Sequence, residues 1–164
     1  MITLHTNFGD IQIELNTAKA PVSAKNFTRY CEEGFYEGTI FHRVISGFMV
    51  QGGGLTKELS EKPTRMAIVN EANRGLKNIK GSIAMARLES PHSATAEFFI
   101  NLDDNAFLDH TATTNKGWGY AVFGQVTMGM EVIEKIAEVA TETRQGFDDV
   151  PVEDIMIERV SVAP

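Results

Sequence analysis

The sequence is poor in the residues that build disulfide frameworks and membrane spans. Its 164 residues include one cysteine, Cys31, so no internal disulfide can form. The longest stretch without a charged residue, Gly117–Met130, contains four glycines and is too short to cross a bilayer. The N-terminal stretch Met1–Thr6 lacks the basic residues and apolar core of a signal peptide. These absences argue against a disulfide-stapled fold and a membrane helix, and they favour a reducing, cytoplasmic setting.

Positive charge is also scarce, above all in the second half of the chain. Lys and Arg number 15 against 22 Asp and Glu, which gives a net charge of −7. Residues 1–82 carry 10 basic and 8 acidic side chains, whereas residues 83–164 carry 5 and 14. Because an acidic chain repels phosphate backbones, nucleic acid is not expected as a partner. The apolar content of 43% is ordinary for a globular protein, and the length predicts a single domain over residues 1–164.

The sequence also lacks a motif for metal binding or nucleophilic catalysis. Its four histidines have neither the short spacing nor the cysteine partners of a zinc site, so we expect no metal and no cofactor. Cys31 falls on the apolar side of a predicted helix, where inert packing is expected. A hydrolase that uses Ser93 with His92 or His42 would need a nucleophile-elbow pattern and an oriented acid, which the sequence does not contain.

What the sequence does contain is a series of short β patterns with two helices among them. Alternating apolar residues on either side of a turn at residues 7–10 predict an N-terminal hairpin. Pro21 and Gly34 bracket one predicted helix, and a second is predicted over Met130–Val139. Further strands are predicted at Thr39–Ile45, Phe48–Gln51, Ser82–Ala86, Phe98–Asn101, Tyr120–Val126 and residues 155–162, the last with a bulge near Arg159. Many short strands with few helices predict an antiparallel barrel or sandwich.

Two of these strands place side chains in unusual surroundings. Strand alternation puts Arg43 on the same face as Phe41 and Ile45, and a guanidinium among apolar groups is costly unless it is paired or faces a ligand. Arg43 therefore lies either at a sheet rim with its head in water or in a binding site. Phe98 and Phe99 point to opposite faces, so one ring lies outside a barrel, covered by a loop or forming part of an apolar binding surface.

At these residues the chain resembles the cyclophilin-type peptidyl-prolyl cis-trans isomerases, and the bacterial members more than the animal ones. The resemblance covers essentially the whole chain and is carried by four ordered blocks: 41–53 (FHRVISGFMVQGG), 81–87 (GSIAMAR), 93–101 (SATAEFFIN) and 122–124 (VFG). It implies a mainly β fold, a closed eight-stranded antiparallel β-barrel capped by two α-helices. The active site of the family lies on the outer wall of that barrel.

The resemblance also implies roles for individual positions. Arg43 stands at the place of the catalytic arginine, and Gln51 at the place of a residue that binds the substrate backbone. The proline pocket falls on Phe48, Met49, Phe99 and Leu108. The groove before the proline is lined by Ala86 and Arg87.

Three further site positions depart from the pattern of the family. Phe107 stands where many animal members have tryptophan, and Tyr120 where they have histidine; the first change leaves only weak cyclosporin binding to be expected. Glu97 stands where glutamine is usual, and an ionised glutamate accepts hydrogen bonds but cannot donate them. Glu97 pairs with Arg43, tunes it or points to solvent, and the sequence leaves these alternatives open.

The resemblance implies an enzyme that accelerates rotation about X–Pro peptide bonds and assists protein folding. Its implied partners are proline-containing peptides and unfolded or folding proteins, and its implied state is a monomer. The main alternative is a non-catalytic binder or chaperone that recognises proline-containing segments with the same pocket. Such a binder could lose Arg43 at little cost, so the presence of Arg43 favours catalysis.

Overall fold

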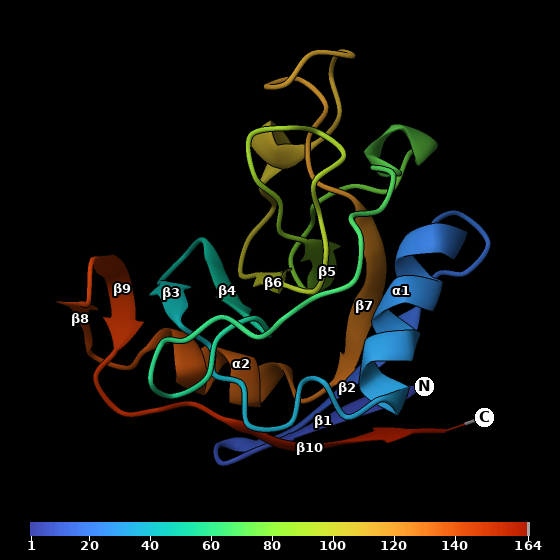
Figure 1. Ribbon diagram of the computed structural model, residues 1–164. Helices are drawn as coiled ribbons and strands as arrows, with labels where there is room; N and C mark the ends of the chain where they lie inside the picture. The colour runs from blue at the N-terminus through green and yellow to red at the C-terminus, as the bar shows by residue number, and fades with distance from the viewer. Residues whose placement is uncertain (164) are drawn as a thin grey trace.

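The computed structural model describes residues 1–163, and antiparallel β-structure dominates it. Eight strands form one sheet: β1 (Ile2–Thr6), β2 (Gly9–Leu15), β3 (Arg43–Ile45), β4 (Met49–Gly52), β5 (Ser82–Met85), β6 (Phe98–Asn101), β7 (Val122–Met128) and β10 (Ile157–Val162). Their order across the sheet is β10-β1-β2-β7-β5-β6-β4-β3, and the sheet curls so that its two ends approach one another (Figure 1). The prediction of a mainly β, eight-stranded antiparallel fold is confirmed.

The barrel closes only in part, so the prediction of a fully closed barrel goes slightly too far. Between β3 and β10 the described residues form no continuous ladder; a single bridge pairs Ile40 with Met156. Two main-chain hydrogen bonds support it, from Phe41 N–H to Ile155 O (2.9 Å) and from Ile157 N–H to Thr39 O (2.9 Å). The strand predicted over Thr39–Ile45 is regular only from Arg43 onward, which leaves too little length to complete the ladder.

Two α-helices contribute side chains to the interior of this half-barrel, as predicted. Helix α1 (Pro21–Glu32) begins with Pro21 in its first turn, where the missing N–H costs nothing, and Gly34 follows it with a φ of +72°. Helix α2 (Met130–Ala137) ends two residues before the predicted Val139. In Figure 1 α1 runs alongside β7, and it also contacts β10, whereas α2 packs on β2, β3 and β4.

Aromatic rings fill the interior around Phe98. Its ring centroid lies 5.4 Å from that of Phe27, 5.3 Å from Tyr36 and 6.0 Å from Phe41, all close to perpendicular. Edge-to-face packing of this kind is the preferred arrangement of aromatic pairs. Phe41 therefore faces the interior, and the prediction that it shares a face with Arg43 was wrong, because regular strand alternation begins only at Arg43.

Several smaller elements complete the chain. A separate hairpin of β8 (Thr141–Arg144) and β9 (Phe147–Pro151) was not predicted, because its residues are mostly polar and exposed. Two short 3₁₀ turns, Ala72–Arg74 and Ala106–Leu108, also had no clear sequence signal. The bulge predicted near Arg159 is confirmed, since the pairing of β1 with β10 skips Glu158. Among residues 1–163 no helix has the length and apolarity needed to span a bilayer.

The central position of Phe98 predicts a large stability effect. Phe98 is fully buried, so Phe98→Ala should lower the free energy of unfolding by about 3–5 kcal/mol. Met66→Ala, at a side chain that is 89% exposed, should change it by less than about 0.5 kcal/mol. Urea unfolding of both variants measures the difference, and equal effects would contradict this account of the core.

Candidate active site

The strands in the middle of the sheet are apolar on both faces. On the inner face Phe98, Ile100 and Val50 join the main core. On the outer face a second, smaller cluster is made of Met49, Ala84, Phe99, Leu108 and Val122. Phe99 is only 4% exposed and its ring lies 5.6 Å from that of Tyr120, so the outer aromatic residue is covered by chain from the loops. The prediction that Phe98 and Phe99 face opposite sides is confirmed.

Strand register aligns the outer side chains into one row. Arg43 of β3 pairs with Gln51 of β4, and Gln51 pairs with Phe99 of β6. Phe99 in turn pairs with Ala84 of β5, which pairs with Val122 of β7. Neighbouring strands lie about 4.8 Å apart, so the side chains of directly paired residues can contact one another. The register therefore places a guanidinium, an amide and an aromatic ring side by side on the outer wall.

A cavity of about 130 Å³ opens over this row. Nine of the residues singled out from the sequence line it: Arg43, Phe48, Met49, Gln51, Ala86, Arg87, Phe99, Leu108 and Tyr120. Its apolar side is formed by the outer cluster, and its polar side by Arg43 and Gln51. Phe107 does not line the cavity; it is 74% exposed and its ring lies 5.6 Å from that of Phe48. The geometry suits an apolar ring of modest size with a polar bond at its edge.

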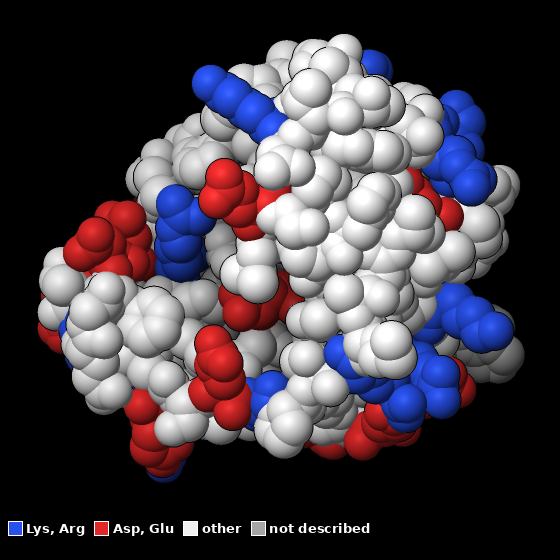
Figure 2. Space-filling model, turned by 45° about the horizontal axis from the view of Figure 1, so that its top comes forward, with Lys and Arg blue, Asp and Glu red and all other residues white. Residues whose placement is uncertain are grey.

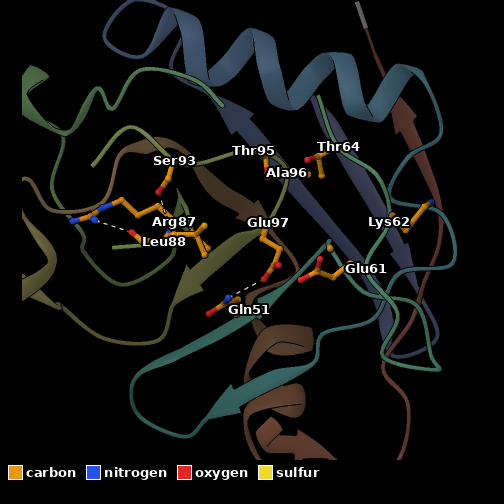
Figure 3. Close-up of a pocket in the computed structure, with 12 residues that line it drawn as sticks. Gln51, Glu61, Lys62, Thr64, Arg87, Leu88, Ser93, Thr95, Ala96 and Glu97 are labelled. Atoms are coloured by element: carbon orange, nitrogen blue, oxygen red, sulfur yellow. Dashed lines mark hydrogen bonds between the residues drawn. The ribbon is translucent and has the colours of Figure 1, made fainter. Parts of the chain in front are cut away.

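A chain of polar contacts leads from Arg43 to a buried histidine. Arg43 Nη1 donates to Gln51 Oε1 (3.3 Å), and Gln51 Nε2 donates to Glu97 Oε1 (3.0 Å). His42 Nε2 lies 3.3 Å from the same Glu97 oxygen. Figure 3 shows Glu97 and Gln51 pointing toward one another. Of the three alternatives for Glu97, direct pairing with Arg43 does not occur among the described residues; Glu97 contacts Gln51 and His42 instead.

The surroundings of Glu97 keep it ionised. Burial by itself would raise the pKa of this carboxyl, but the hydrogen bond from His42, the charge of His42 and the hydrogen bond from Gln51 together lower the pKa below its ordinary value. Figure 2 shows acidic side chains around a hollow beside the β8–β9 hairpin. Glu97 lines that hollow together with His42.

Arg87 is held by main-chain carbonyl groups. Its guanidinium donates to the oxygens of Gly119 (2.9 Å), Leu88 (3.0 Å), Glu89 (3.0 Å) and Asn115 (3.0 Å). It also lies 4.7 Å from the ring centroid of Tyr120. Four of its five N–H groups are thus occupied, so Arg87 ties two surface loops together and offers a substrate mainly its stem.

A second cavity of about 340 Å³, whose lining residues are drawn in Figure 3, shares Gln51, Ala86 and Arg87 with the first. Its remaining walls come from the segment after β4 and from the loop that leads into β6. Glu97 lines this second cavity and directly precedes β6. Glu97 thus belongs to the wall of the second cavity and not of the first.

Sequence reasoning missed the polar groups that support the site. Asn101 Nδ2 donates to Asn78 Oδ1 (3.0 Å) and to Ser82 Oγ (2.9 Å), and Asn105 donates to Asn101 Oδ1 (2.8 Å) and Phe48 O (2.9 Å). This buried network fixes the main chain behind the first cavity. The available signal was Asn101 itself, a polar residue that ends an apolar strand on its outer face. His42 gave no such signal, because its partner Glu97 is remote in sequence.

The geometry gives no support to the hydrolase alternative. Ser93 Oγ donates to Ser90 O (2.5 Å) and accepts from Leu88 N–H (2.9 Å), so it stabilises a turn. Within the described part of the chain no hydrogen bond joins Ser93 to His92 or His42. Cys31 is buried, which raises the pKa of its thiol far above the ordinary value. Residues 1–163 contain no group of three or more His, Cys, Asp or Glu arranged to hold a metal ion.

Comparison with known proteins adds a family to this geometry. The chain is 55% identical over 163 residues to peptidyl-prolyl cis-trans isomerase B of Escherichia coli, covering 99% of each chain. It is 52% identical over 161 residues to peptidyl-prolyl cis-trans isomerase cyp18 of Streptomyces antibioticus, covering 98% of this chain and 97% of the relative. A cyclophilin of Cryptosporidium parvum, crystallised in the presence of the dipeptide Ala-Pro, has the same fold at 24% identity, with a TM-score of 0.78 and coverage of 99% and 98%. A sequence profile described as cyclophilin type peptidyl-prolyl cis-trans isomerase/CLD matches residues 1–162. Together with the eight-stranded half-barrel, these matches establish that the chain belongs to the cyclophilin-type peptidyl-prolyl cis-trans isomerase family.

Proposed function

We propose that this chain accelerates rotation about X–Pro peptide bonds, with Arg43 as the catalytic residue and the 130 Å³ cavity as the proline pocket. The observation that carries the proposal is the pairing of Arg43 with Gln51 at the edge of an apolar cavity of that size. The proposal treats residues 1–164 as one isomerase domain. It takes Phe48, Met49, Phe99 and Leu108 as the walls that receive the proline ring.

The reaction itself explains why so little chemistry is needed. The barrier to rotation is about 20 kcal/mol because resonance gives the C–N bond partial double-bond character. No bond to a heavy atom breaks, so no nucleophile, metal or proton relay is required. In the twisted transition state the prolyl nitrogen regains a localised lone pair, which can accept a hydrogen bond that the planar amide accepts poorly. Every 1.36 kcal/mol of preference for the twisted form gives a tenfold acceleration.

Arginine suits this task better than lysine would. Its guanidinium stays charged, is weakly hydrated, and offers several donors in a rigid plane. In the free protein Arg43 is exposed and bonded to Gln51, so it is oriented before a substrate arrives. A peptide lying over the cavity would cover the guanidinium and remove water from it, which strengthens its hydrogen bond to the prolyl nitrogen. Gln51 is proposed to bind the peptide main chain, and Ala86 and Arg87 are proposed to line the groove before the proline, with main-chain contacts at Arg87.

The proposed partners follow from the pocket. They are proline-containing peptides and unfolded or folding proteins, with no nucleic acid and no membrane, and the chain acts as a monomer. A role in assisting folding is part of the proposal, because slow X–Pro rotation limits the folding of many chains. A reducing, cytoplasmic setting fits the free, buried thiol of Cys31. A non-catalytic binder remains the second candidate, and direct measurement of isomer exchange in one peptide by NMR separates binding from catalysis.

Replacement of Arg43 tests the catalytic assignment. Arg43→Ala should lower kcat/KM for an X–Pro peptide by about 100-fold, the usual effect of removing one transition-state donor, and Arg43→Lys should recover only part of that loss. The matched control is Arg159→Ala, an exposed arginine on β10. Near wild-type turnover by Arg43→Ala would refute the assignment.

Phe107 provides a separate test at the rim of the pocket. Its exposed ring lies beside Phe48 at the rim of the cavity. Phe107→Trp therefore adds an indole N–H that can donate to a ligand large enough to extend beyond the cavity. Weak cyclosporin binding is expected for the wild type, and the variant should bind about tenfold more tightly, the value of one hydrogen bond. Isothermal titration calorimetry measures this, with Met66→Trp as an exposed control. An unchanged affinity would show that position 107 does not limit cyclosporin binding.

A further inference from the structure

The side chain of Gln51 has one chemically consistent orientation. A guanidinium can only donate hydrogen bonds, and an ionised carboxylate can only accept them. Gln51 lies between one group of each kind, Arg43 at 3.3 Å and Glu97 at 3.0 Å. Its amide must therefore turn the oxygen toward Arg43 and the NH₂ group toward Glu97. In the flipped orientation two donors would face each other at Arg43, and two acceptors at Glu97.

Glu97 is itself held in place from three sides. His42 Nε2 lies 3.3 Å from the oxygen that also accepts from Gln51. His42 is buried, and its Nδ1 has no hydrogen-bond partner within residues 1–163, so its contact with Glu97 is made by Nε2, whose N–H the carboxylate accepts. Gly54 packs against the third side of the carboxylate, so closely that a Cβ at that position would lie 2.6 Å from Glu97 Oε2. The carboxylate therefore has little freedom to turn away.

From this geometry we infer that Glu97 is a positioning residue, whose carboxylate sets the orientation of the Gln51 amide and through it holds the Arg43 guanidinium beside the cavity. The inference rests on the proposed catalytic role of Arg43 and extends it. Without the carboxylate the Gln51 amide can flip, and Arg43 loses its acceptor and moves among several rotamers. Within residues 1–163 the second N–H of the Gln51 amide has no partner, so the same orientation leaves Gln51 a donor for a carbonyl oxygen of the peptide.

A double-mutant cycle between Glu97 and Gln51 tests whether Glu97 acts on Arg43 through Gln51. Glu97→Ala should lower kcat/KM by about fivefold, mainly through kcat, because one orienting hydrogen bond is lost. In a Gln51→Ala background the same change should have almost no further effect, since the contact through which Glu97 acts is already gone. Multiplicative losses in the double variant would show that Glu97 acts by another path and would overturn the inference.

A spectroscopic measurement separates positioning from general loss of structure. The side-chain ¹⁵N–¹H signal of Arg43 Nε should report a restricted guanidinium in the wild type and a mobile one in Glu97→Ala. Glu97→Gln keeps an oxygen that can accept from Gln51, so it should retain at least about half of the wild-type kcat/KM and most of the Arg43 restriction. An Arg43 signal that is identical in the wild type and in Glu97→Ala would overturn the inference.

Two further variants control for charge and for folding. Asp149→Asn removes a carboxylate from the same hollow beside the β8–β9 hairpin, and the asparagine tolerates the φ of +60° at that position. This variant should change kcat/KM less than twofold. A loss equal to that of Glu97→Ala would mean that the negative charge in the hollow affects catalysis, rather than the hydrogen bond between Glu97 and Gln51. If Glu97→Ala does not fold, Gly54→Ala displaces the carboxylate without removing it and should give a similar loss with the same mobile Arg43. Full activity with an unchanged Arg43 signal in Gly54→Ala would contradict the inference.

The two proposals fail in different ways. If Arg43→Ala retains near wild-type turnover, the catalytic assignment falls and the inference about Glu97 falls with it. If Arg43→Ala is inactive but the losses of the Glu97 and Gln51 variants multiply, only the positioning role of Glu97 is refuted.

Discussion

The site depends on one constraint, the register that pairs β3, β4, β6, β5 and β7 across the sheet. That register sets Arg43 opposite Gln51, Gln51 opposite Phe99 and Phe99 opposite Ala84. Side chains alternate between faces with a period of two, so a shift of one residue would send Phe99 into the interior and Phe98 out of it. The interior rings around Phe98 prevent such a shift, because they would lose their edge-to-face contacts. Core packing inside the half-barrel thus fixes the arrangement of groups outside it.

A sheet that is apolar on its outer face would usually expose a sticky surface to water. Here the outer cluster is covered by loop residues, and the 130 Å³ cavity opens over its exposed edge. The loops are fixed in turn by polar side chains: Arg87 bonds four main-chain oxygens, and the buried asparagines bond Phe48 and Leu108. The cavity is therefore preformed, and a ligand that enters it need not first order these loops.

Hydrogen bonds and charge also order the polar side chains on the outer face of the sheet. Arg43 is exposed and would be free to move if it had no acceptor nearby. Donors and acceptors alternate along Arg43, Gln51, Glu97 and His42, and this connects Arg43 to the buried His42 that precedes it in the chain. Since a carboxylate cannot donate, each amide and ring proton in this chain has one consistent position. A reaction that needs one well-placed donor is served by such a chain without any group that changes its covalent state.

The sequence by itself determined the strands with strong alternation, helix α1 from its proline and glycine signals, the opposite directions of Phe98 and Phe99, and, through four ordered blocks, the family and most of the cavity lining. It could not determine the β8–β9 hairpin, whose polar residues carry little alternation, nor the inward direction of Phe41, because irregular chain before β3 breaks the period of two. Only the tertiary structure decided the partners of Glu97 and Arg87, and it left the barrel partly open. The physical reason is that hydrophobic periodicity is local, whereas the position of a charged side chain depends on donors and acceptors that residues remote in sequence bring to it.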